Sequence, residues 1–177
     1  MAASLFLLLA VILAFAGGGG PWTMVATVAL ATASGTTFPD LDSPLRLQHR
    51  SAVVHSVLPL YIAMLDPRTW PVAAGLGFGI GFHLAADLFP TTMRGYATIK
   101  MPLLGSIGVL PSYLWIAVHA GANLVGGVLI LERIGTRPAT TCALAAAGVL
   151  GAAYLMRTQG GLYALALLTG LGWLMLR

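Results

Sequence analysis

Residues 71–88 read PVAAGLGFGIGFHLAADL, an apolar run of helical length with two polar side chains near its end. Four glycines alternate with larger apolar residues from Gly75 to Gly81 and form two overlapping small-xxx-small pairs. Such pairs allow neighbouring helices to approach closely. The segment therefore predicts a helix that packs tightly against its neighbours and carries His83 and Asp87 one turn apart on one face.

The rest of the chain is similarly apolar. Of its 177 residues, 58% are hydrophobic and only 8% are charged, and the mean hydropathy is +0.90. A soluble domain carries about a quarter of charged residues, so water cannot be the solvent for most of this surface. We expect an all-α fold, a polytopic helical protein integral to the membrane, with residues 1–177 forming a single domain.

The charged residues exclude one class of partner. Nine basic residues give a formal net charge of +4, but they stand singly in short loops without interleaved aromatic residues. This pattern is typical of interfacial anchors, and we expect no nucleic-acid partner. The single cysteine, Cys142, excludes an internal disulfide. The basic residues are too evenly divided to fix the orientation in the membrane.

Glycines, prolines and charged residues divide the chain into six or seven membrane-embedded helices. The expected helices cover residues 2–16, 21–34, 50–65, 71–88, 112–132, 138–156 and 162–176. Pro59 is expected to kink the third helix. Residues 36–49 form a polar loop, and residues 89–111 form an interfacial segment that serves as a partly re-entrant lid. The polar motifs occupy a core of about residues 36–110, and the helices of residues 112–176 follow it.

Most histidines and carboxylates of the chain fall between Asp40 and Asp87. Ionisable groups are expensive inside a membrane, so we interpret this cluster as functional. If the third helix begins near Arg50, His55 lies about one and a half turns into it. The short turn before the fourth helix makes these two helices antiparallel. We therefore expect His55, His83 and Asp87 to converge at one face of the membrane.

Imidazole and carboxylate side chains together predict a metal site. They favour zinc or manganese, whereas an all-oxygen site would suit magnesium or calcium. We expect a divalent cation, with zinc as the first choice. The predicted metal ligands are Asp40, Asp42, His49, His55, His83 and Asp87. This set exceeds the protein ligands of a typical catalytic zinc, so it can accommodate one ion or two.

Four of the residues in the polar segment are also candidates for catalysis. Asp42 and His49 could each act as the general base instead of binding the ion, and the same alternative applies to Asp40. Arg50 is expected to stabilise negative charge that develops during the reaction.

Four residues further along the chain extend the predicted site. Arg94 and Lys100, in the interfacial segment, are candidates for holding a substrate phosphate. His119 and Asn123 lie one turn apart in the helix of residues 112–132 and are candidate additional ligands.

The polar residues form a three-part motif. It reads Pro39-Asp40-Leu41-Asp42, then His49-Arg50 with His55-Ser56, then His83 with Asp87. In these residues the chain resembles the YdjM-type, LexA-regulated family of membrane-bound metal-dependent hydrolases, over about residues 20–110. The resemblance implies an enzyme of a prokaryotic cytoplasmic membrane. Val54 stands where the family motif has threonine, and the chain lacks the N-terminal histidine of several members, for which His119 is a candidate replacement.

The expected substrate follows from the position of the site. A metal site at the membrane boundary, beneath a semi-apolar segment, favours a membrane lipid or lipid-linked substrate over a freely diffusing one. We therefore expect a phosphoesterase. The alternative is a cation transporter or channel that uses the His and Asp cluster as its ion site, which would lie near the bilayer midplane. A third interpretation is a scaffold in which the metal only fixes the loops.

Overall fold

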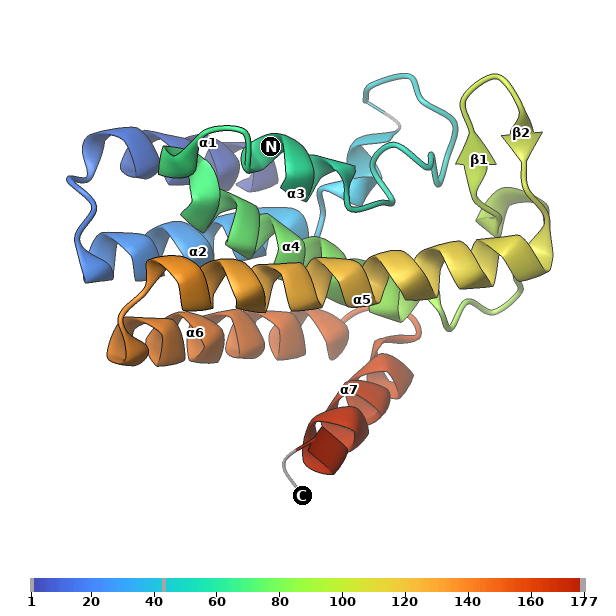
Figure 1. Cartoon of the computed structure of the whole chain (residues 1–177). Coiled ribbons are helices and arrows are strands. Elements are labelled where there is room, and N and C mark those ends of the chain that lie inside the picture. Colours follow the sequence, from blue (N-terminus) through green and yellow to red (C-terminus); the bar gives the residue numbers. More distant parts are fainter. Residues whose placement is uncertain (1, 43, 176–177) are drawn as a thin grey trace.

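The computed structural model describes residues 2–42 and 44–175, and these residues contain seven α-helices. Most of the helices pack side by side, and α7 projects away from them at one end (Figure 1). The helices are α1 (Ala2–Ala16), α2 (Pro21–Gly35), α3 (Leu58–Ala63), α4 (Trp70–Asp87), α5 (Val109–Ile134), α6 (Arg137–Leu155) and α7 (Gly161–Met175). Within the described residues, strands are limited to one hairpin, β1 (Lys100–Met101) and β2 (Gly105–Ser106). The all-α expectation is confirmed. Leu176, the expected end of the last helix, lies outside the described residues.

Prolines and glycines set the helix ends that the sequence predicted. Pro21 and Pro138 lie in the first turns of α2 and α6, where the missing N–H group would have no helical partner. Gly18 and Gly19 separate α1 from α2 with positive φ angles, which glycine adopts without steric cost.

Helix α4 lies at the centre of the bundle and is buried along most of its length. In Figure 1 it runs beside α2 and α5, with α6 next to them. A Cβ atom on Gly79 would lie 2.5 Å from Cα of Gly35 in α2, and one on Gly77 would lie 2.8 Å from the carbonyl oxygen of Asn123 in α5. The two glycine pairs therefore serve two different neighbours, which confirms the close packing predicted for this segment.

Two helices, α5 and α6, are long and apolar enough to cross a membrane, judged by length and composition among the described residues. They span about 39 Å and 28 Å, against a bilayer core of about 30 Å. One face of α5 exposes a stripe of large apolar side chains, Leu114, Val118, Val125 and Leu129. Helices α1 and α7 are apolar but shorter. These two candidate spans are fewer than the six or seven membrane-embedded helices expected.

The expected helix over residues 50–65 is wrong, because helix α3 begins only at Leu58. Pro59 lies in its first turn and does not kink it; proline lacks the N–H group that a helix interior needs. The preceding residues instead form an irregular segment that starts at Arg50, whose φ angle of 56° lies in the left-handed region. His55 therefore lies in a turn before α3 and not one and a half turns into a helix.

The interfacial segment contains a hairpin that the sequence did not predict. Strands β1 and β2 pair in antiparallel fashion, with Lys100 opposite Ser106. Lys100 also forms a parallel bridge with Ser51. The hairpin is thus bonded to the irregular segment that leads to His55.

Candidate metal centre

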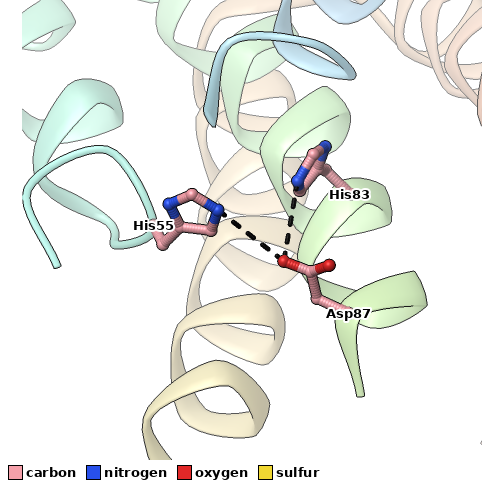
Figure 2. Close-up of side chains that lie close together, drawn as sticks. All are labelled: His55, His83 and Asp87. Carbon is pink, nitrogen blue, oxygen red and sulfur yellow. Dashed lines mark ion pairs between the residues drawn. The ribbon is translucent and has the colours of Figure 1, made fainter. Parts of the chain in front are cut away.

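Three of the predicted ligands meet at the end of α4 (Figure 2). His83 and Asp87 project from the last turns of α4, and His55 reaches them from the turn before α3. The distance to Oδ2 of Asp87 is 3.7 Å from Nε2 of His55 and 3.6 Å from Nε2 of His83. One ligand atom from each residue lies within 4.8 Å of the other two.

Hydrogen bonds to carbonyl oxygens set the orientation of both imidazole rings. Nδ1 of His55 lies 3.2 Å from the carbonyl oxygen of Ser51, and Nδ1 of His83 lies 2.9 Å from that of Thr36. A carbonyl oxygen can only accept, so we assign the proton of each neutral ring to Nδ1. Both Nε2 atoms then present a lone pair to Asp87, which is the arrangement of metal-bound histidines.

One oxygen of the Asp87 carboxylate accepts a hydrogen bond, and the other does not. Oδ1 accepts a hydrogen bond of 2.6 Å from Nη2 of Arg50. Oδ2 is buried and has no hydrogen-bond partner. It faces two nitrogen lone pairs, and three acceptors turned toward one another repel unless a cation lies between them. Tetrahedral zinc places its ligand atoms about 3.3 Å apart, a few tenths of an ångström less than the two distances from the imidazole nitrogens to Oδ2. All three ligand atoms lie within 4.8 Å of one another, so small movements of the side chains would let the donor set hold a divalent cation.

Arg50 holds the carboxylate of Asp87, and Asp42 in turn holds the backbone of Arg50. The guanidinium of Arg50 also donates to the carbonyl oxygen of Ala97 at 2.6 Å. Its backbone N–H donates to Oδ2 of Asp42 at 2.6 Å, and Asp42 is 1% exposed. A left-handed backbone is strained for arginine, and this charged hydrogen bond stabilises it. The geometry assigns Asp42 and Arg50 to positioning Asp87.

Burial shifts the titration of two groups around the cluster. It lowers the pKa of His55 to about 2, with His83 and Arg50 adding to the effect. His55 is therefore neutral at physiological pH, the protonation state that a metal ligand needs. Partial desolvation raises the pKa of Asp40, whose side chain stays accessible to solvent; His83 opposes this effect and Asp87 reinforces it. A carboxyl group with a raised pKa is suited to accept a proton from water.

The cluster lines a cavity of about 300 Å³. The predicted residues in its wall are Asp40, His49, Arg50, His55, His83 and Asp87. Asp42 is not part of this wall; it lies behind it, 3.4 Å from Nδ1 of His49. A larger cavity of about 440 Å³ lies at the opposite end of the bundle, where α1 and α2 meet, and its wall contains neither histidine nor carboxylate.

The four remaining predicted residues lie outside the cavity wall. Arg94 is exposed, and Nζ of Lys100 donates to the carbonyl oxygen of Gly95. His119 makes a hydrogen bond of 2.8 Å through Nδ1 to its own helix. Asn123 is fully buried and donates to the carbonyl oxygen of Ser56 at 3.2 Å, so it secures the segment that holds His55.

The sequence did not predict the contribution of the end of α6, which carries Tyr154, and of the turn between α6 and α7. Tyr154, Thr158 and Gln159 complete the cavity wall. The hydroxyl of Tyr154 lies 3.0 Å from Nδ1 of His83. The side-chain amide of Gln159 donates a hydrogen bond to the hydroxyl oxygen of Thr91, in the segment that follows α4. The order of the helices could have indicated this contribution. Successive helices run in opposite directions, so α4 and α6 both end at the same side of the bundle.

Replacing Tyr154 with phenylalanine is expected to weaken metal binding by about tenfold, because a hydroxyl that helps to orient His83 is lost. Calorimetric titration of the purified protein with zinc would measure the change. Tyr163→Phe is the matched control, since Tyr163 lies on α7 and is 70% exposed. Equal affinities for the two variants would contradict a role of Tyr154 in orienting His83.

Comparisons with known proteins find no matching family model, no matching curated protein and no matching solved structure. The resemblance in the three-part motif stays a prediction.

Proposed function

We propose that this chain is an integral membrane hydrolase that depends on a divalent cation held by His55, His83 and Asp87. The observation that carries the proposal is the unpartnered Oδ2 of Asp87, which is buried between two imidazoles whose Nδ1 atoms are bonded to carbonyls. Two histidines and one carboxylate match the ligand set of catalytic zinc sites that keep a fourth position open. Zinc is the first candidate and manganese the second.

The membrane placement rests on the outer surface of the helices. Helices α5 and α6 could each cross a bilayer, and an apolar stripe that includes Leu114 and Leu129 faces outward from α5. A contiguous exposed apolar stripe favours a membrane or protein interaction surface. In the proposed arrangement the shorter helices α1, α2, α4 and α7 are also embedded, with α4 shielded by protein.

The residues around the proposed cation have separate tasks. When bound there, a divalent cation supplies Lewis-acid activation of a water molecule and of a phosphoryl oxygen. Asp40 faces the cavity and is suited to take the proton from that water. Arg50 holds Asp87, and Tyr154 holds His83. In this proposal the proton that Asp40 takes from water then passes to the leaving-group oxygen of the ester, so proton transfer needs no residue outside the cavity wall.

The substrate proposed is a phosphate ester linked to a lipid. The cavity wall is mostly polar, so it suits a headgroup and not an acyl chain. It lies at the end of α4, beside the end of α6 and the start of α7, which is where a bilayer surface would meet the bundle. A cation-transport site would instead be expected near the midplane.

Purified protein is expected to contain about one equivalent of zinc or manganese, to lose thermal stability on chelation, and to release phosphate or a headgroup from phospholipid or polyprenyl phosphate vesicles. Elemental analysis, thermal unfolding with and without chelator, and a phosphate-release screen measure these three effects. Iron in place of zinc would contradict the proposal, since the same ligand set serves iron oxygenases. Metal-free protein whose stability ignores chelator would contradict the metal site itself.

A further inference from the structure

The tip of the hairpin carries two leucines that contact little of the chain. Leu103 is 106% exposed and Leu104 is 84% exposed. No other large apolar side chains of the described residues are more exposed. Two adjacent leucines at this exposure bury almost none of their apolar surface within the fold. Their side chains therefore favour contact with an apolar partner outside it.

The backbone at the tip adds to this conclusion. Leu103 has a φ angle of 69°, in the left-handed region that glycine and asparagine adopt readily and leucine does not. A turn of this kind ordinarily takes glycine or asparagine. A leucine in a strained backbone conformation, with a side chain that packs against nothing in the fold, favours a functional role over a structural one.

The surroundings of the tip favour a lipid surface as the partner. Strand β2 ends just before α5, one of the two candidate spans, and Val109 and Leu110 at the start of α5 are also exposed. In Figure 1 the hairpin stands to the side of the bundle at the end where α5 begins. Lys100 at the base of the hairpin adds a positive charge. Apolar side chains beside a basic residue at the end of a span are typical of segments that lie in the membrane interface.

We propose that Leu103 and Leu104 insert into the lipid interface next to the metal centre and anchor the cavity at headgroup level. This inference rests on the membrane placement in the proposed function. It adds a lipid contact that is separate from the helices and separate from the substrate cavity.

Hydrogen bonds connect the proposed anchor to the metal centre. The backbone N–H of Lys100 donates to the carbonyl oxygen of Arg50 at 3.1 Å, and the N–H of Ala52 donates to that of Lys100 at 2.9 Å. Arg50 in turn holds Asp87 at 2.6 Å. The hairpin and the segment that supports the metal-binding carboxylate are therefore bonded to each other, so anchoring of the tip would set the position of the cavity relative to the lipid headgroups.

A fluorophore at the tip tests the insertion directly. In a Cys142→Ala background, which has no other cysteine, Leu104→Cys is labelled with an environment-sensitive dye and placed in lipid nanodiscs. We expect blue-shifted emission that lipids brominated near the headgroup quench. Gln48→Cys, in the polar loop, serves as the water-exposed reference, and Leu103→Cys is a second labelling site at the tip.

Two outcomes overturn the proposal. Emission like that of the Gln48→Cys reference, quenched by iodide in the buffer and not by brominated lipid, would place the tip in water. Blue-shifted emission that brominated lipid leaves unchanged and that disappears on dilution would assign the tip to contact with a second copy of the chain.

A double variant, Leu103→Asn with Leu104→Ser, separates this inference from the proposed function. Asparagine tolerates the left-handed backbone, so the hairpin is retained. We expect hydrolysis of a vesicle-embedded phosphate ester to fall at least about tenfold, because two apolar side chains leave the lipid, and hydrolysis of a short-chain soluble ester to stay unchanged. An equal loss on both substrates would overturn the anchoring role. A wild-type protein inactive on both would overturn the proposed hydrolase and leave the labelling result standing.

Discussion

Replacing Asp87 with asparagine is expected to weaken zinc binding by more than about 100-fold. Changes to residues that merely orient a ligand already cost about 10-fold to 100-fold, and this substitution removes both the charge and the unpartnered Oδ2 that faces His55 and His83. Elemental analysis of purified protein and calorimetric titration would measure the loss. Activity on any phosphate ester should disappear with the metal.

The same substitution has a cost for the fold that can be measured separately. The asparagine oxygen can still accept from Arg50, but a charged pair of 2.6 Å becomes a neutral hydrogen bond, which should cost about 1–2 kcal/mol of the free energy of unfolding without metal. The amide nitrogen in place of Oδ2 can donate to an imidazole nitrogen and should offset part of this cost, so the loss of stability should be small beside the loss of zinc affinity. Asp66→Asn is the matched control, because Asp66 pairs with Arg68 at 2.8 Å on the exposed side of the molecule. An Asp87→Asn protein that retains zinc as tightly as the Asp66→Asn protein would exclude Asp87 as a ligand.

The sequence predicted the parts of this structure that depend on local spacing. Apolar runs bounded by glycine or proline predicted six of the seven helices, because backbone preferences at helix ends act within a few residues. The four-residue interval between His83 and Asp87 predicted their shared helix face, because the helix period imposes it. The convergence of His55 on this pair also followed, although the helix expected to carry His55 begins only after it, at Leu58.

The sequence could not predict contacts that depend on tertiary structure. The left-handed backbone of Arg50 requires an acceptor from Asp42 and pairing with Lys100, and no local pattern encodes either one. The carbonyl oxygens that orient the imidazoles belong to Ser51 and Thr36, and a carbonyl is present in every residue. Such supporting contacts are visible only once the chain is folded.

Replacing Gly79 with alanine is expected to lower the free energy of unfolding by about 1–3 kcal/mol, the usual cost of overpacking. The added methyl group would collide with the carbonyl oxygen of Thr32 and would lie 2.5 Å from Cα of Gly35. Both obstacles are backbone atoms, so no side-chain rotation relieves the contact and α2 must move away from α4. Thermal or denaturant unfolding in detergent would measure the loss.

The displacement of α2 should also reach the metal centre, because Thr36 follows α2 directly and its carbonyl oxygen fixes Nδ1 of His83. Zinc affinity of the Gly79→Ala protein should therefore fall about tenfold, as it does when a residue that orients a ligand is lost. Gly148→Ala, in α6, is the matched control, because it makes the same substitution at a site where the new Cβ would meet nothing within 4 Å. This control should be at least as stable as the wild type, because alanine favours a helix over glycine by up to about 1 kcal/mol. A Gly79→Ala protein as stable as the Gly148→Ala protein would show that contact between α2 and α4 does not limit the fold. Unchanged zinc affinity in a destabilised Gly79→Ala protein would show that His83 keeps its orientation without the carbonyl of Thr36.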